Sequence, residues 1–241
     1  MKRFIFVLVL VFATTIALQA QYTSGMTGML NIPTAECDEA GSVKLGANML
    51  PTSMVPNLNV NYKYTYNYFA TISFFTFLEL NYRATLLKTN YMSEDGRYNQ
   101  QDRTYSIKAR VLKEGKYRPA IALGANDPFA DLGKNYYAAY YGVLTKSINF
   151  RDGGELSASF GYKYRALYDT EPERRWHDGL FGGARYTPWF YKDLDLMAEY
   201  DTEGVNVGAA VLLWRHLAIN CFTRDFNTIS VGLRYEGVLI H

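Results

Sequence analysis

Apolar and polar residues alternate one by one along most of the chain after residue 40. In GELSASFGYKYR, residues 154–165, Phe160 belongs to the apolar set and Lys163 to the polar set. The stretches 78–86 and 228–236 repeat this pattern. Successive side chains of an extended chain point to opposite faces. The alternation therefore predicts β-strands with one apolar face and one polar face.

About twelve such segments follow one another, give or take two. No 3.6-residue period lies between them, which excludes helical crossovers and hence a parallel sheet. The second segment keeps its phase over an unusual length, from Leu58 to Phe74. The expected strands begin near Ser42, Leu58, Leu78, Thr104, Pro119, Tyr137, Glu155, Gly179, Leu194, Gly204, Leu217 and Thr228.

The connections between these segments alternate in length. Short ones, such as 150–154 and 214–216, take turns with longer polar ones at Lys88–Gln101 and Tyr168–Trp176. Outer-membrane barrels have two unlike ends of this kind, with the short turns facing the periplasm. Aromatic residues, which are enriched at membrane–water interfaces, gather near the short connections: Phe74, Phe75, Phe77, Trp189, Phe190, Tyr191 and Trp214.

The fold class predicted from these patterns is all-β, an antiparallel up-and-down transmembrane β-barrel of about 12 strands. Strands of about ten residues, tilted by about 45°, have the length that a bilayer crossing needs. The alternative is a secreted soluble β-sandwich, whose outward faces are polar. Charged strand residues here fall almost wholly on one parity, and the other parity is apolar or aromatic, which favours the membrane barrel.

The first twenty residues have the composition of a cleaved secretory signal. Lys2 and Arg3 precede an apolar run from Phe4 to Leu18, and small residues allow cleavage after Ala20, with Ala17 as the alternative. A membrane-anchoring helix is the alternative, but the run is shorter than the roughly 20 residues that span a bilayer. The expected organisation is a signal peptide (1–20), an N-terminal periplasmic or luminal segment (21–40) and a barrel (41–241) in the bacterial outer membrane.

Composition argues against several classes of function. The 25 Lys and Arg nearly balance the 23 Asp and Glu, so nucleic acid is not an expected partner. Two cysteines are too few for a disulfide scaffold, and the strand parity turns Cys221 outward, away from Cys37. With three histidines and no clustered carboxylates, neither a metal nor a cofactor is expected.

His177 and Asp178 are adjacent, so their side chains point to opposite faces of a strand and do not form a catalytic pair. No catalytic motif is present elsewhere in the sequence, and an enzyme is not expected.

If the apolar face meets lipid, the polar face lines the lumen, and there basic residues outnumber acidic ones. Two interpretations remain open. The charges pair in a network that fills the barrel, or they form a basic passage for an anionic ligand. The basic positions are Lys44, Lys63, Arg83, Lys108, Arg110, Lys146, Lys163, Arg165, Arg185, Arg224 and Arg234, and the acidic positions are Glu79, Glu155, Asp195, Glu199 and Glu236.

The stretch GMTGMLNIPTAE, residues 25–36, has two glycines, a proline and no regular period. Such a segment can fold back into a lumen with its backbone close to the wall. We predict that it partly plugs the barrel, and the alternative is a periplasmic tether. The predicted plug motif is Gly28, Asn31, Pro33 and Thr34, with Asn31, Thr34 and Glu36 meeting luminal Arg and Lys.

The same region resembles the N-terminal signature of the YjbH-type outer-membrane proteins associated with exopolysaccharide biosynthesis. The matching residues are Gly28, Met29, Leu30, Pro33, Thr34, Ala35 and Gly41. Three further stretches, 67–83, 119–146 and 180–201, are similar to that family. Two features differ from it. Family members are often much longer, and the final RYEGVLIH lacks the terminal phenylalanine of many outer-membrane barrels.

The resemblance implies an accessory role in surface polysaccharide production or export and gives no catalytic residue. The expected function is therefore an outer-membrane barrel with a basic lumen that assists export or surface assembly of an acidic exopolysaccharide. Its expected partners are outer-membrane lipid, an anionic polysaccharide and periplasmic export or assembly proteins. One alternative is a closed scaffold or adhesion protein that binds partners through its outer loops. A membrane-embedded lipid or glycan hydrolase is the other.

Overall fold

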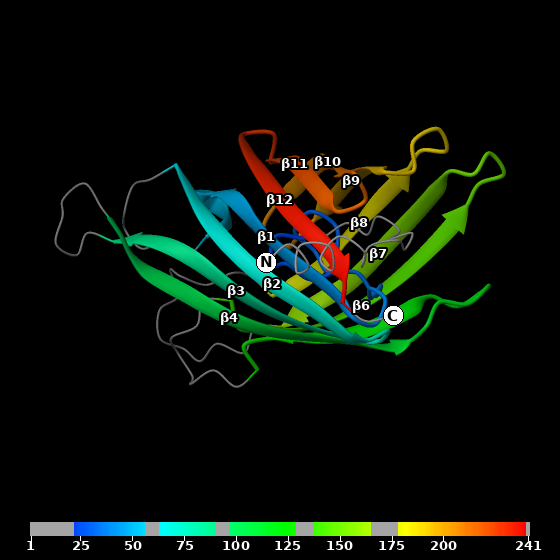
Figure 1. Cartoon of the computed structure of the whole chain (residues 1–241), viewed down its shortest axis with the longest axis horizontal. Helices are drawn as coiled ribbons and strands as arrows, with labels where there is room; N and C mark the ends of the chain where they lie inside the picture. Colours follow the sequence, from blue (N-terminus) through cyan, green and yellow to red (C-terminus); the bar gives the residue numbers. More distant parts are fainter. Residues whose placement is uncertain (1–21, 56–62, 90–96, 129–136, 165–177, 240–241) are drawn as a thin grey trace, which may run out of the picture.

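The computed structural model describes residues 22–55, 63–89, 97–128, 137–164 and 178–239. They form a closed barrel in which each strand pairs antiparallel with its neighbours in sequence and β12 pairs with β1 (Figure 1). A short 3₁₀ turn, η1 (Thr52–Met54), follows β1. The strands are β1 (Ser42–Pro51), β2 (Tyr64–Phe75), β3 (Leu78–Thr89), β4 (Arg97–Leu112), β5 (Ala120–Asn126), β6 (Ala139–Asn149), β7 (Glu155–Tyr164), β8 (Gly179–Thr187), β9 (Leu194–Tyr200), β10 (Val205–Leu213), β11 (Leu217–Arg224) and β12 (Thr228–Val238).

The predicted all-β, up-and-down barrel is confirmed. The closing pair keeps a regular register over eight residues, from Ser42 opposite Val238 to Met49 opposite Val231. Within the described residues, no helix is long and apolar enough to cross a membrane.

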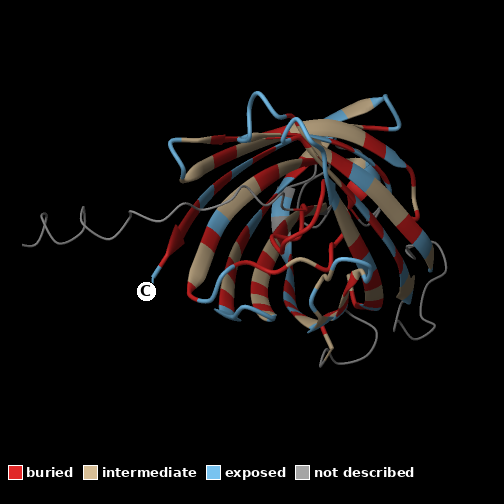
Figure 2. Cartoon of the chain, turned by 90° about the vertical axis from the view of Figure 1, so that its right-hand side faces the viewer, coloured by how far each residue is buried: buried red, intermediate tan, exposed pale blue. Residues whose placement is uncertain are grey.

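Exposure alternates along the strands, which appears as bands in Figure 2. In β2, Thr65 and Asn67 are buried, whereas Tyr66 and Tyr68 point outward and are exposed. The outward face bears large apolar side chains around the barrel, so the period of two places the polar set inside, as predicted. Examples are Leu45, Tyr68, Ile107, Leu123, Leu144, Phe160, Leu180, Leu196 and Leu233.

The barrel has two different ends. At the turn end, the connections 76–77, 113–119, 150–154, 188–193 and 214–216 join strands, and the chain enters β1. At the opposite end, here called the loop end, lie the connections 52–63, 90–96, 127–138 and 165–178 and two shorter ones, 201–204 and 225–227. The predicted alternation of long and short connections therefore fails for the last two, which are as tight as those of the turn end.

Two strands begin more than two residues from their predicted starts. β2 begins at Tyr64 rather than Leu58, and 56–62 lie outside the described residues. β4 begins at Arg97, seven residues before the predicted Thr104. Its register with β3 shifts between Leu87 and Lys88. A bulge adds an unpaired residue and interrupts the period of two, so this part of β4 reads as a polar loop in the sequence.

Candidate functional site

The N-terminal residues 22–40, here called the plug, lie inside the barrel and enter β1 at the turn end (Figure 2). The plug folds as a tight reversal in which Gly28 forms an isolated antiparallel bridge with Pro33. Two backbone hydrogen bonds close the reversal: Thr23 N–H donates to Leu30 O (3.0 Å) and Met29 N–H to Ile32 O (2.9 Å). Because the plug bonds to itself in this way, part of its backbone is satisfied without the wall.

The reversal requires glycine at position 28. A Cβ built there would lie 2.3 Å from the Ile32 carbonyl oxygen and 2.6 Å from the Tyr22 ring. The first contact is with backbone and the second with a buried ring, so a side chain at this position would force both to shift. The glycine of the predicted plug motif is thus explained by close approach between two arms of the segment.

One side of the plug is apolar and forms the hydrophobic core of the molecule. Met29, Leu30 and Ile32 are almost completely buried. They belong to a cluster with inward residues of the wall, which include Ala122, Tyr141, Val143, Phe181, Met197, Ala210 and Phe222. Burial of these side chains is the main contribution that holds the plug against the wall from β5 to β11.

The other side of the plug presents backbone carbonyls to β1 and β2. The amides of Asn48 and Asn67 both donate to the Thr23 carbonyl oxygen, at 3.2 and 2.8 Å, and the Thr71 hydroxyl donates to Gly25 O at 2.7 Å. These polar wall residues replace the water that would otherwise solvate the plug backbone.

A fully buried ion pair fixes the centre of the plug to β3 and β4. Lys108 Nζ lies 3.0 Å from the Glu79 carboxylate and donates to Thr27 O at 2.8 Å. Glu79 in turn accepts from the Thr27 backbone N–H (3.1 Å) and hydroxyl, and from the Asp38 N–H (3.1 Å). Both charges are therefore neutralised and hydrogen-bonded, the condition under which a buried ion pair is tolerated.

Arg185 of β8 holds the end of the plug in a two-pronged contact. Its two terminal nitrogens each donate to one oxygen of Glu36 at 3.0 Å, and one of them also contacts Glu155 at 3.2 Å. The planar guanidinium matches the carboxylate in this geometry, which makes the pair directional as well as strong.

A second cluster of charges meets the reversal near the loop end. Glu199 accepts from the backbone N–H groups of Leu30 (2.9 Å) and Asn31. Asp201, in the β9–β10 turn, forms an ion pair with Arg224 and accepts from the Asn31 amide. Burial alone raises the pKa of Asp201, but the charge of Arg224 and the hydrogen bonds from Asn31 and Asn206 more than offset this and leave the pKa below its ordinary value.

The remaining predicted lumen residues fall into several groups. Lys44 pairs with Asp38 of the plug, Arg234 lies 2.7 Å from Glu236, and Asp195 accepts from the Thr187 hydroxyl. Arg110 points to the turn end and donates to Thr76 O at 2.6 Å. Lys63 is exposed before β2, with its ammonium over the Tyr64 ring. Arg165 lies outside the described residues, as does His177.

Lys146 does not face the lumen. Thr145, its neighbour on β6, is fully buried and bonds to Ser159 inside the barrel. Lys146 therefore lies on the outward parity, where its ammonium is 2.7 Å from Glu114 of the turn end. Lys146 lies near the end of β6. A one-residue error in the predicted alternation places a side chain on the opposite face of the strand.

The plug motif makes contacts that differ in part from those expected. Glu36 meets a luminal arginine, as described above. Asn31 instead contacts the carboxylates of Glu199 and Asp201. The hydroxyl of Thr34 is buried and has no hydrogen-bond partner among the described residues.

Buried charge in the described lumen is mixed rather than basic. Six buried cations face eight buried carboxylates. The cations are Lys44, Arg83, Lys108, Arg185, Arg224 and Arg234, and the carboxylates are Asp38, Glu79, Asp102, Asp127, Asp195, Glu199, Asp201 and Glu236. Asp38, Asp102, Asp127 and Asp201 lie in the plug, in the extension of β4 or in turns, so strand parity did not reveal them.

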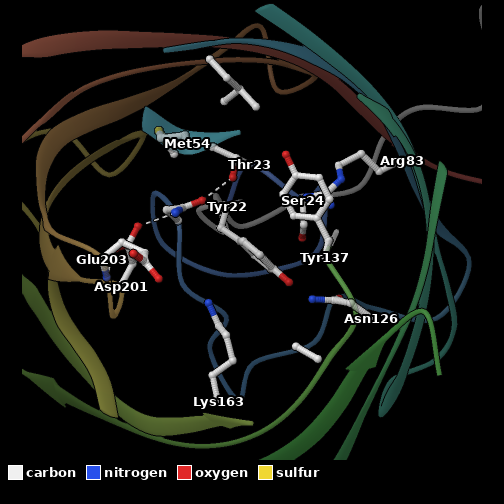
Figure 3. Close-up of a pocket in the computed structure, with 13 residues that line it drawn as sticks. Tyr22, Thr23, Ser24, Met54, Arg83, Asn126, Tyr137, Lys163, Asp201 and Glu203 are labelled. Carbon is white, nitrogen blue, oxygen red and sulfur yellow. Dashed lines mark hydrogen bonds between the residues drawn. The ribbon is translucent and has the colours of Figure 1, made fainter. Parts of the chain in front are cut away.

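Between the plug and the loop end lies a cavity of about 60 Å³, here called the vestibule (Figure 3). At roughly 10–15 Å³ for each water, this space holds a few water molecules. The vestibule is lined by Tyr22, Thr23, Ser24, Asn31, Leu50, Met54, Arg83, Asn126, Tyr137, Ala139, Lys163, Asp201 and Glu203.

Neither cysteine forms a disulfide: Cys37 is buried in the plug and Cys221 is exposed on β11, as its parity predicts. Burial raises the pKa of the Cys37 thiol to about 11. The thiol is therefore protonated at neutral pH and unsuited to nucleophilic chemistry. His216, in a tight turn, contacts the Glu236 carbonyl oxygen through Nδ1 at 3.0 Å.

Comparison with known proteins adds the family. Residues 20–236 match the model of the YjbH family, described as "Exopolysaccharide biosynthesis protein YbjH". The chain belongs to the YjbH family. It is also 27% identical over 248 residues to the uncharacterized lipoprotein YjbH of Escherichia coli (strain K12). That match covers 90% of this chain and 33% of the relative, so the chain spans about a third of the relative's length.

The resemblance to the YjbH family predicted from the sequence is thus confirmed, and the structure shows what its signature residues do here. Met29, Leu30 and Ala35 are buried between the plug and the wall. Gly28 and Pro33 pair within the reversal, and Gly41 turns the chain into β1 with a φ of 83°. In this YjbH-family barrel the signature therefore specifies the plug.

Proposed function

We propose that this chain is an outer-membrane β-barrel that assists export or surface assembly of an exopolysaccharide through a lumen closed by its own plug. The observation that supports it is the nature of the closure. The barrel is closed by a separate segment of chain bonded to the wall, rather than by wall side chains that meet across the centre. Such a segment can in principle leave the lumen while the twelve-stranded wall remains paired.

The outward face supports the membrane location. Large apolar side chains cover the strands, with Leu123, Leu144 and Leu233 each about half exposed. A contiguous apolar surface of this extent marks contact with lipid or with another protein. Aromatic residues of the turn end, such as Trp189, Phe190 and Trp214, are exposed where a membrane interface would lie.

The proposed cargo is an acidic exopolysaccharide, although the closed lumen is not basic. Two of the plug's own carboxylates neutralise wall cations, Glu36 on Arg185 and Asp38 on Lys44. Withdrawal of the plug would remove both carboxylates and leave Arg185 and Lys44 facing the passage. These two positions would then offer an acidic glycan local cationic contacts, with Glu155 still beside Arg185.

The experiment that tests the proposal is single-channel conductance of the refolded full chain in a planar bilayer. The substitution Glu36→Gln weakens the contact of the plug with Arg185 while keeping its shape, and removal of residues 22–40 is the extreme case. We expect few openings for the unaltered chain, more for Glu36→Gln, and anion-selective current that an acidic glycan blocks.

The matched control is Glu114→Gln, which removes one carboxylate from a half-buried ion pair away from the plug. It should leave conductance unchanged. Folding of every variant is checked by the shift between heated and unheated samples on electrophoresis. Folded variants that all fail to conduct would contradict the proposed passage.

A closed scaffold that binds partners through the loop end is the second candidate. It is favoured by one observation: five of the six buried cations are paired with carboxylates, as a permanently filled barrel requires. Under this proposal Glu36→Gln would lower stability without producing current.

A further inference from the structure

We propose that the vestibule binds the carboxylate of an acidic sugar unit, with Arg83 as its main ligand. This inference rests on the proposed role in handling an acidic exopolysaccharide and names the place of recognition. Among the described residues, Arg83 is the one buried cation that forms no ion pair with a carboxylate.

Arg83, on β3, is only 6% exposed. One of its terminal nitrogens donates to the Thr104 hydroxyl at 3.2 Å, and its guanidinium carbon lies 3.8 Å from the centre of the Tyr137 ring. No described carboxylate forms an ion pair with it, and its Nε has no hydrogen-bond partner among the described residues. A buried guanidinium in this condition carries a large desolvation cost that an anionic ligand would relieve.

Asp127 is a carboxylate on which the charge of Arg83 acts, but it is hydrogen-bonded to another group. It accepts from the Tyr105 backbone N–H at 2.7 Å. Burial raises the pKa of Asp127 above its ordinary value, and that hydrogen bond and the charge of Arg83 offset this only in part. No ion pair joins Asp127 to Arg83 among the described residues, so the guanidinium keeps donors for a further anionic ligand.

The surroundings of Arg83 suit a sugar substituent. Figure 3 shows Arg83 on one side of the vestibule beside the Tyr137 ring, with Tyr22 crossing toward Asn126 and Lys163 on another wall. A guanidinium binds a carboxylate through two parallel N–H donors, while amide and phenol groups bind hydroxyls. Lys163 is a second cation in the lining, and its charge also acts on the Asp201 carboxylate, which lines the vestibule together with Glu203.

The volume of the vestibule suits the acidic group of a sugar. A space of about 60 Å³ accommodates a carboxylate with a few water molecules. We therefore place the acidic group inside the vestibule and the sugar ring toward the loop end. Recognition would in this way involve one acidic unit at a time and require no movement of the plug.

The test is calorimetric titration of the full chain in detergent with sodium glucuronate at constant ionic strength, alongside glucose and sodium sulfate. A ligand of this size is expected to bind at about 1 mM. Arg83→Gln should weaken glucuronate binding at least about tenfold, because a hydrogen-bonded charge is lost. Arg83→Lys keeps the charge but loses the planar guanidinium. Its affinity for glucuronate should lie between those of the unaltered chain and Arg83→Gln.

Arg110→Gln is the matched control, since it removes an arginine from the next strand at the turn end. It should bind glucuronate as the unaltered chain does. If Arg83→Gln does not fold, Lys163→Gln replaces it and should also weaken binding. Glucose or sulfate binding as tightly as glucuronate, or unchanged affinity in Arg83→Lys and Lys163→Gln, would overturn the inference.

The conductance experiment on the same preparations separates this inference from the proposed function. Current through Glu36→Gln without glucuronate binding would retain the passage and overturn the vestibule site. Glucuronate binding without current would support the vestibule site and contradict the passage. The closed scaffold would then be the favoured function.

Discussion

Gly183 on β8 lies where the plug packs against the wall. A Cβ at this position would be 2.6 Å from Glu199 Cβ, 2.9 Å from Ala198 O and 3.0 Å from the sulfur of Met29. Two of these neighbours belong to the wall and one to the plug. The absence of a side chain at this residue therefore allows the plug and β9 to approach together.

We expect Gly183→Ala to lower the free energy of unfolding by about 1–3 kcal/mol, because the added methyl group overpacks a site bounded by backbone. Urea titration of the refolded barrel measures this. Gly142→Ala is the control: its Cβ would meet only Leu123, at an ordinary 3.5 Å. A change within about 0.5 kcal/mol is expected there. Equal effects at both glycines would show that the plug does not press on β8.

Among the elements, the β9–β10 turn connects the plug to the wall. Its Asp201 is held between Arg224 of β11 and the Asn31 side chain. The turn is tight: Asp201 Oδ1 accepts from the backbone N–H groups of Glu203 and Gly204, both at 3.1 Å. One carboxylate thus fixes a turn, a neighbouring strand and the plug reversal at once.

The lowered pKa of Asp201 gives this junction a pH dependence of definite sign. A carboxylate whose folded pKa is depressed stabilises the fold above its ordinary pKa of about 4 and ceases to do so as the pH falls through the lowered value. We expect Asp201→Asn to cost about 3 kcal/mol near neutral pH, because Arg224 loses its buried partner and keeps only the exposed Asp225 as an ionic partner. The same substitution should reduce the loss of stability below pH about 4.

Urea titrations between neutral pH and the acid limb measure both effects. Asp152→Asn, in the exposed 150–154 turn, should leave the acid limb as in the unaltered chain. An acid limb unchanged by Asp201→Asn would mean that other carboxylates dominate acid unfolding.

For the molecule as a whole, the position of the bilayer follows from the outward face. Leu144 lies midway along β6 and is 42% exposed, whereas Tyr117 lies in a turn-end connection and is 89% exposed. Leu144→Arg should reduce the free energy of folding into bilayers by about 2–4 kcal/mol, as expected for a cation near the midplane. Tyr117→Arg should change it by about 0–1 kcal/mol. Similar small effects at both sites would contradict a lipid-embedded wall.

Much of this architecture could be predicted from local pattern. The period of two identified the strand faces, and most strands begin at or next to the predicted residue, Glu155 and Leu217 among them. The exceptions have local causes. The bulge opposite Leu87 hides the start of β4, and Lys146 near the end of β6 was assigned to the wrong face.

The interior was less predictable, because its partners are far apart in sequence. Glu36 meets Arg185 across 149 residues, and Leu30 meets Glu199 across 169. No periodicity encodes such pairs. Parity placed Arg185 and Glu199 among the lumen residues, but it did not show which groups they contact or that the buried charge is balanced.

The sequence by itself determined the barrel and its two faces, since the alternation of side chains along a strand is a local property of extended backbone. The YjbH-family signature likewise marked the segment from Gly28 to Gly41 before its contacts were known. Only the tertiary structure decided that this segment fills the lumen, which cations its carboxylates neutralise, and that Arg83 stays without an ionic partner among the described residues. The physical reason is the closure of the barrel, which brings strands that are distant in sequence around one axis. The partner of each luminal charge therefore depends on which strands and which part of the plug lie beside it.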